Sequence, residues 1–223
     1  MPDFSGAALA HVPIPPAPDP EALTPAERRL LSTLGTDQRR REWFAGRMAG
    51  RAALRALGGG HLSILRDRSG APRLEGIRAE RWDVALTHGR GHAAAIATTA
   101  GGPFPHLGLD WVDAEDAARV ARIAPRVLDD AERRLCGDDP KALMVAWGVR
   151  EAIAKAARTG MFVHALSGVR VRALDLSAGR AEVEPPGATV RILDGAAGAL
   201  VVIAALTPAA RAAARRGAGL DPR

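Results

Sequence analysis

Cysteine, aromatic residues and long hydrophobic runs are all scarce in this chain of 223 residues. The single cysteine, Cys136, excludes an intramolecular disulfide and a metal site built from several cysteines. With four Phe, four Trp and no Tyr, the chain has little material for stacking nucleic-acid bases. The longest apolar run, GALVVIAAL, is too short to span a bilayer, and the Pro-rich N-terminal residues do not resemble a signal peptide. We therefore expect a soluble, cytoplasmic protein.

The composition that remains is globular and basic. Hydrophobic residues make up 47% of the chain and charged residues 25%, which is typical of a folded domain. The formal net charge is +6. Nucleic acid, anionic lipid, a phosphate-rich cofactor or an acidic protein could each explain this charge, and composition alone does not choose among them.

Local patterns predict an α+β fold in two halves, each a small antiparallel sheet packed with helices. Helices are expected from Thr24, over 37–57, over 114–123 and over 139–158, with the acidic segment LDDAERRL before the last of them. Strands are expected at HLSILR, WDVALTH, HAAAIATT, HLGLDWV, VRVRALDL, RAEVEP, TVRIL and ALVVIAAL.

The stretch GGPFP, residues 101–105, is the best candidate for a boundary between the lobes. We divide the chain into an extended N-terminal segment, an N-terminal lobe, a C-terminal lobe and a basic tail, which cover residues 1–20, 21–105, 106–207 and 208–223. No internal repeat is strong enough to indicate a duplication.

The segment AWGVREAIAKA places Trp147, Glu151 and Lys155 four residues apart on one face of a helix. Small apolar residues occupy the opposite face and would pack on a core. Taken alone, the polar stripe also fits a solvated surface on which Glu151 pairs with Lys155.

Two strand ends carry polar residues that suit ligand binding. In LGLDWVD, Asp110 follows an apolar strand, where a carboxylate can hold a hard cation or cap the next helix. In ALTHGRGH, Thr87 and His88 end another strand, and such a histidine is often a structural hydrogen-bonding residue.

Arginines occur in two further patterns. In EWFAGRMAGRAAL, Arg47 and Arg51 share a helix face that could clamp a phosphate or face solvent. In RDRSGAPRL, a tight turn carries Arg66, Arg68 and Arg73.

The order of these motifs, AGR, GxP, T-H, GxD and WxxREAxxK, resembles the 4′-phosphopantetheinyl transferase superfamily, specifically its two-lobed Sfp-type branch. The resemblance covers roughly Arg40 to Phe162 and implies two similar lobes with a ligand cleft between them. It implies a monomeric, Mg²⁺-dependent enzyme that moves the phosphopantetheine arm of coenzyme A to a serine of an acyl, aryl or peptidyl carrier protein and releases adenosine 3′,5′-bisphosphate. A basic enzyme would be steered toward the acidic helix of such a carrier.

The resemblance also implies roles for individual residues. Asp110 and Glu151 match metal ligands, Glu151 also matches the base for the carrier serine, and Lys155 matches a lysine that meets the phosphates. The expected coenzyme A contacts are Arg47, Arg66, Thr87, His88 and Lys155.

Three positions depart from the family pattern. Val112 stands where a second acid is usual, Arg150 replaces a lysine, and Ala71 replaces the cation of a G-K/R-P turn, for which Arg68 or Arg73 could substitute. A family member that binds coenzyme A with weak or lost transferase activity is therefore one alternative. A basic nucleic-acid-binding module is another, although we expect neither nucleic acid nor membrane as a partner. The resemblance names no particular carrier protein.

Overall fold

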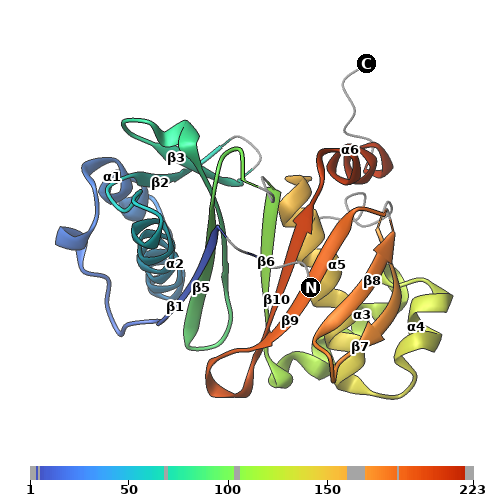
Figure 1. The fold of residues 1–223 in the computed structure, drawn as a ribbon. Helices are drawn as coiled ribbons and strands as arrows, with labels where there is room; N and C mark the ends of the chain where they lie inside the picture. Colours follow the sequence, from blue (N-terminus) through green and yellow to red (C-terminus); the bar gives the residue numbers. More distant parts are fainter. Residues whose placement is uncertain are drawn as a thin grey trace. The chain divides into compact units, whose positions relative to one another are not determined.

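The computed structural model describes Phe4 and residues 6–67, 70–102, 106–159, 169–184 and 186–218. The chain divides into two compact units, residues 3–105 and 106–223 (Figure 1). Each unit combines helices with antiparallel strands, which confirms the expected α+β class. In the part of the chain described, no helix has both the length and the apolar character needed to cross a membrane.

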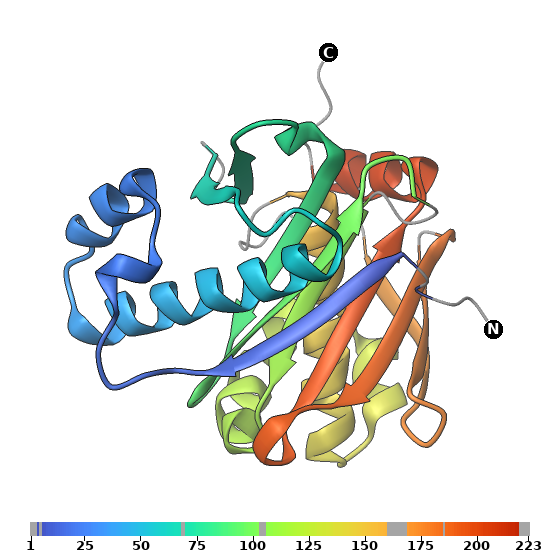
Figure 2. The same ribbon diagram turned by 60° about the vertical axis from the view of Figure 1, so that its left-hand side comes forward.

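The N-terminal unit is built on an antiparallel sheet with the strand order β1-β5-β4. The long helix α2 packs against this sheet and runs alongside β1 (Figure 2). A hairpin of β2 and β3 lies beside α1 and β4. The elements of this unit are β1 (Ala7–Pro13), α1 (Pro25–Ser32), α2 (Asp37–Ala56), β2 (Ser63–Arg66), β3 (Pro72–Glu75), β4 (Trp82–His88) and β5 (His92–Thr99), with 3₁₀ turns at Pro20–Ala22 and Ala79–Arg81.

The C-terminal unit is an antiparallel sheet with the strand order β6-β10-β9-β8-β7, covered by helices. Helix α5 packs on β6 and β10 and supplies much of the core, including Val145, Val149 and Ile153, none of which is exposed. The elements are β6 (His106–Val112), α3 (Ala117–Val127), α4 (Asp130–Cys136), α5 (Pro140–Ala157), β7 (Arg170–Asp175), β8 (Arg180–Glu184), β9 (Ala188–Asp194), β10 (Leu200–Leu206) and α6 (Pro208–Gly217), with 3₁₀ turns at Ala114–Asp116 and Ala196–Gly198.

The prediction of a basic tail over 208–223 is wrong for its first ten residues, which form helix α6. Thr207 caps this helix by accepting a hydrogen bond from the Ala210 backbone at 3.2 Å, and Pro208 occupies its first turn. Ala210 and Ala214, one turn apart, are both buried. The composition suggested a tail because alanine offers a weak hydrophobic signal, yet its small side chain allows close packing.

At the start of α1, the buried carboxylate of Glu27 joins three segments of the N-terminal unit. It accepts hydrogen bonds from the backbone of Thr24 at 2.9 Å and of Ile64 in β2 at 2.9 Å. Arg51 of α2 pairs with the same carboxylate at 2.5 Å. We call this arrangement the Glu27 clamp.

The C-terminal unit repeats the arrangement at the start of α4, as the Glu132 clamp. Glu132 accepts from the backbone of Asp129 and of Val171 in β7, both at 2.8 Å. Arg150 of α5 pairs with it at 2.6 Å. Both clamps begin from the same letters, AERRL, at residues 26–30 and 131–135. The two units therefore share a structural device that the sequence analysis did not recognise as a repeat.

Candidate functional site

In the C-terminal unit, two glycines let β6 and α5 approach closely beside Asp110. A β-carbon at Gly108 would lie 1.8 Å from the carbonyl oxygen of Ala152. A β-carbon at Gly148 would lie 2.6 Å from Cγ2 of Val112 and 3.5 Å from Oδ2 of Asp110. The strand can therefore present Asp110 directly to the helix.

This close approach joins Asp110 to Lys155. Lys155 Nζ donates to Asp110 Oδ1 at 2.6 Å, and Asp110 is only 9% exposed. Glu151 is also buried, at 5% exposure. The interpretation of this stripe as a solvated Glu–Lys pair is therefore wrong, since both carboxylates lie out of solvent and the lysine bonds to Asp110.

The environment of Glu151 favours its neutral form. Burial, opposed by the positive charges of Lys155 and Arg119 and aided by the negative charge of Asp110, raises the pKa of this carboxyl to about 7. A carboxyl group with a pKa near neutrality can both accept and return a proton under ordinary conditions.

The donor set of Asp110 and Glu151 is small for a metal site. No group of three or more His, Cys, Asp or Glu residues within the described ranges is placed to hold a metal ion. Mg²⁺, however, is often held by one or two carboxylates together with water and substrate phosphate oxygens. The two buried carboxylates fit that pattern. They do not form a site in which the protein supplies most of the metal ligands.

Val112, which stands where the family pattern has an acid two residues after Asp110, lies on the same face of β6 as Asp110. Both Val112 and Asp110 approach Gly148 of α5, so they share the face of β6 that the alternation of a strand predicts. Val112 is 7% exposed and belongs to the hydrophobic core. Asp113 does not replace it, because its Oδ1 accepts from Nε1 of Trp111 at 2.8 Å.

In the N-terminal unit, Arg47 is a buried cation. It is 4% exposed, its Nε donates to the carbonyl of Ile64 at 3.1 Å, and its guanidinium carbon lies 3.9 Å from the centre of the Trp43 ring. Burial and the repulsion of Arg66 lower the pKa of Arg47 to about 9, against the opposing effect of Glu27. The side chain thus remains charged at neutral pH in a site already rich in positive charge.

Arg66 extends this positive region at the end of β2. Burial lowers its pKa, and the charge of Arg39 on α2 lowers it further. Arg66 therefore lies within the electrostatic influence of Arg39, and Arg47 within that of Arg66. Mutual repulsion among cations is a typical property of an anion-binding site before its ligand arrives.

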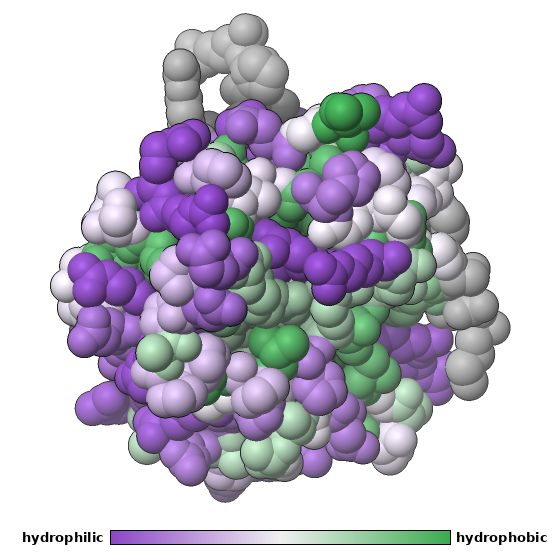
Figure 3. Space-filling view, turned by 90° about the vertical axis from the view of Figure 1, so that its left-hand side faces the viewer, coloured by the Kyte–Doolittle hydropathy of each residue, from purple (hydrophilic) through white to green (hydrophobic). Residues whose placement is uncertain are grey.

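Other expected arginines have different partners. Arg51 is held by the Glu27 clamp, so the predicted Arg47–Arg51 phosphate clamp is not formed. Arg73 pairs with Glu75 at 2.8 Å on the surface, and Arg68 lies outside the described residues. Figure 3 shows the face of this unit, on which hydrophilic side chains are interspersed with smaller hydrophobic areas.

Thr87 and His88 occupy the last two positions of β4, as predicted. Thr87 is 7% exposed and His88 is exposed, because successive residues of a strand point to opposite faces.

The sequence analysis missed the glycines that bring Asp110 to α5, the two clamps and Arg39. The repeated letters AERRL were the available signal for the clamps. Nothing local marks Arg39, whose relevance depends on the position of β2 beside α2.

Comparison with known proteins finds a match in the N-terminal unit. Residues 26–98 match the family model of the 4′-phosphopantetheinyl transferase N-terminal domain. No curated protein matches the chain. A solved structure titled as an ACPS–CoA complex of Chronobacterium ammoniagenes is 22% identical over 41% of this chain and 93% of its own length, with a TM-score of 0.33.

The matched residues contain Arg47, Arg66, Thr87 and His88. This stretch of the chain is therefore similar to the N-terminal domain of the 4′-phosphopantetheinyl transferases.

Proposed function

We propose that the protein is an Sfp-type, holo-carrier-protein synthase that transfers the 4′-phosphopantetheine arm of coenzyme A to a serine of an acyl, aryl or peptidyl carrier protein. The observation that carries this proposal is the pair of buried carboxylates, Asp110 and Glu151, with Lys155 beside them. Buried acids next to a lysine suit phosphoryl-type transfer, which depends mainly on positioning and charge neutralisation.

In the proposed reaction, the hydroxyl oxygen of the carrier serine attacks the phosphorus atom that bears the pantetheine group. The bond from that phosphorus to the bridging pyrophosphate oxygen breaks, and adenosine 3′,5′-bisphosphate leaves with the bonding electrons. Glu151 accepts the serine proton, for which its raised pKa is well matched. Lys155 neutralises charge on the pyrophosphate, and its flexible stem allows it to exchange Asp110 for a phosphate oxygen.

Asp110 and Glu151 are the residues that we assign to Mg²⁺, which when bound would neutralise the pyrophosphate. Lys155 now occupies one oxygen of Asp110, and a bound cation would take its place there.

We assign the 3′-phosphate of coenzyme A to the positive residues of the N-terminal unit. Arg47 is rigidly held by Ile64 and Trp43, which suits it to fix a 3′-phosphate in one position. Arg66, Thr87 and His88 are the further contacts that we propose. Binding an anion would relieve the repulsion between Arg47 and Arg66.

The test is to incubate the protein with coenzyme A, Mg²⁺ and a panel of apo-carrier proteins, and to weigh each carrier by mass spectrometry. We expect a gain of one phosphopantetheine group on at least one carrier. Asp110→Asn and Glu151→Gln should abolish the gain, whereas Glu182→Gln, an exposed carboxylate on β8, should not change it.

A protein that binds coenzyme A in calorimetry but modifies no carrier would instead be a binding member of the superfamily. A protein that does neither would overturn the proposal altogether.

A further inference from the structure

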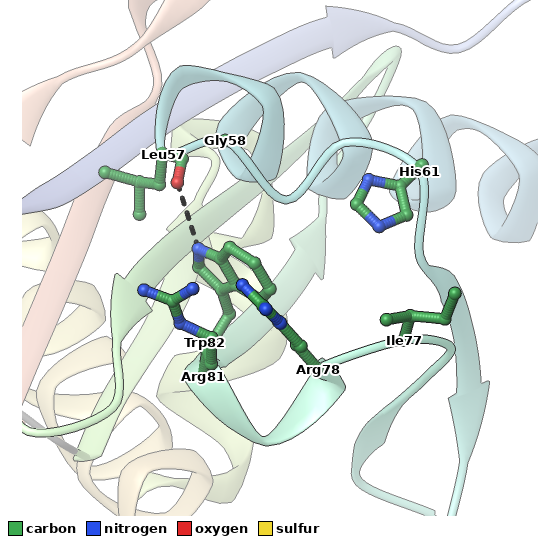
Figure 4. Close-up of a pocket in the computed structure, with 7 residues that line it drawn as sticks. All are labelled: Leu57, Gly58, His61, Ile77, Arg78, Arg81 and Trp82. Carbon is green, nitrogen blue, oxygen red and sulfur yellow. Dashed lines mark hydrogen bonds between the residues drawn. The ribbon is translucent and has the colours of Figure 1, made fainter.

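A pocket in the N-terminal unit is lined by none of the residues assigned to transfer. It has a volume of about 550 Å³ and is lined by Leu57, Gly58, His61, Ile77, Arg78, Arg81 and Trp82 (Figure 4). Its size is within the range of ligand-binding pockets. Trp82 is the first residue of β4 and His88 the last, so about 20 Å of strand separates this pocket from the proposed coenzyme A contacts.

The base of the pocket is the fixed indole of Trp82. Its Nε1 donates to the carbonyl of Leu57 at 3.0 Å, and the neighbouring Gly59 leaves room for the ring, since a β-carbon there would lie 3.0 Å from it. Arg81 lies 5.6 Å from the ring centre. Figure 4 shows Arg81 and Arg78 beside the indole, with His61 and Ile77 facing each other across the rest of the pocket.

The rim combines an unusually exposed hydrophobic side chain with positive charge. Ile77 is 80% exposed, the highest value among the exposed large hydrophobic residues described. Within the described residues, neither Arg78 nor Arg81 forms an ion pair, and no acidic side chain lines the pocket. Trp, Arg and aliphatic residues around a preformed hollow are the composition of a protein-binding hot spot.

The backbone that presents Ile77 is held in place rather than loose. Gly76 and Arg78 on either side both have positive φ, of 139° and 60°, and left-handed backbone is costly for a residue such as arginine. Hydrogen bonds from Ala79 to Gly76 at 3.2 Å and from Arg81 to Arg78 at 3.0 Å close the turn. The chain therefore keeps a strained turn that displays an isoleucine to solvent.

We propose that this pocket is a docking site for an acidic segment of a partner protein. A hydrophobic side chain of that segment packs between Ile77 and Trp82, and its carboxylates pair with Arg78 and Arg81. Charge complementarity favours an acidic partner, because the lining is positive and carries no counter-charge. The site is separate from the transfer residues, so the proposal does not depend on the proposed function.

The probe for this proposal is a short fluorescein-labelled peptide with a central Leu-Leu pair flanked by Asp and Glu, titrated with the full chain by fluorescence anisotropy. Two matched peptides replace the leucines by serine or the acids by lysine. We expect the acidic leucine peptide to bind about tenfold more tightly than the serine peptide, and the lysine peptide not to bind. Binding should weaken as salt is added.

The variants Ile77→Ser and Arg78→Gly should each weaken the acidic leucine peptide by about fivefold or more. Arg78→Gly is the cleaner of the two, because glycine adopts the left-handed backbone freely and the turn stays folded. The control is Arg134→Gln with Leu135→Ser, an adjacent exposed arginine and leucine on α4. In two-dimensional NMR, the indole signal of Trp82 should shift on titration.

Three results would overturn the proposal: no binding up to about 1 mM peptide, affinity that the pocket variants leave unchanged, or equal binding of the leucine and serine peptides. If the leucine and serine peptides bind equally and inorganic phosphate competes with them, the pocket is a simple anion site.

Discussion

At the scale of single residues, Glu151 is a group whose burial opposes stability. Its pKa is raised from 4.5 to about 7 in the folded protein, so the folded state holds a proton that the unfolded state has already lost. The titration of Glu151 therefore leaves the free energy of unfolding unchanged below pH 4.5 and lowers it as the pH rises toward 7.

From this we predict that Glu151→Gln is more stable than the natural protein at pH 8, by about 3 kcal/mol at 1.36 kcal/mol per unit of pKa. At pH 4 the two should be alike, because both carry a neutral group. Urea unfolding at the two pH values measures the difference. A constant difference across this range would show that Glu151 is not titrating near neutrality.

His88 allows a residue-scale test of the 3′-phosphate assignment, because it is exposed and its removal leaves no cavity. We predict that His88→Ala weakens coenzyme A by roughly tenfold and dephospho-coenzyme A much less, since a charge-assisted contact is worth about 1.5–3 kcal/mol. Calorimetry with both ligands checks this. An equal loss of affinity for the two ligands would show that His88 does not contact the 3′-phosphate. Arg47 is less suitable for this test, because its substitution would also leave the Ile64 carbonyl unpaired.

At the scale of elements, the contact between β6 and α5 depends on glycine. We predict that Gly108→Ala destabilises the protein by about 3 kcal/mol or more, because the added carbon would meet backbone atoms that cannot move aside. Gly46→Ala in α2 is the matched control. A β-carbon there has open space, so we expect a gain of about 0.5–1 kcal/mol from better helix propensity. Thermal unfolding compares the two, and a well-tolerated Gly108→Ala would contradict the close approach.

Each of the two clamps connects a helix start to a strand and to a second helix through one buried carboxylate. We predict that Glu27→Gln and Glu132→Gln each lower stability by about 3–5 kcal/mol, because each leaves a largely buried arginine without its counter-charge. Glu182→Gln on the surface should change it by less than about 0.5 kcal/mol. Denaturant unfolding of the three variants provides the comparison. Losses as small as that of Glu182→Gln would mean that the clamps are dispensable.

At the scale of the whole molecule, the net charge of +6 should act on encounters with acidic partners. If the proposed function is correct, kcat/KM for an apo-carrier protein should fall by about tenfold or more between low and high ionic strength, since steering is screened by salt. KM for coenzyme A provides the comparison within the same assay. A salt-independent kcat/KM for the carrier would show that the net charge does not guide association.

What the sequence determined by itself is mostly local. The Thr24 cap, Pro25 and Glu27 predicted the start of α1, and the apolar spacing predicted α5 over 139–158 against the observed 140–157. The order of motifs predicted a resemblance that the family model matching residues 26–98 supports, and the alternation of a strand puts Asp110 and Val112 on one face, as observed. These properties depend on residues that are neighbours in the chain or on one regular element.

Only the tertiary structure decided the partners of the charged residues. Lys155 could bond to Glu151 one turn away, yet it bonds to Asp110, 45 residues distant, because two glycines bring β6 against α5. Arg51 shares a helix face with Arg47 but belongs to a clamp, because β2 and α1 bring Glu27 to it. In a buried, water-poor environment, a charged side chain pairs with the opposite charge that tertiary packing places beside it. The spacing of residues along the chain does not specify that environment.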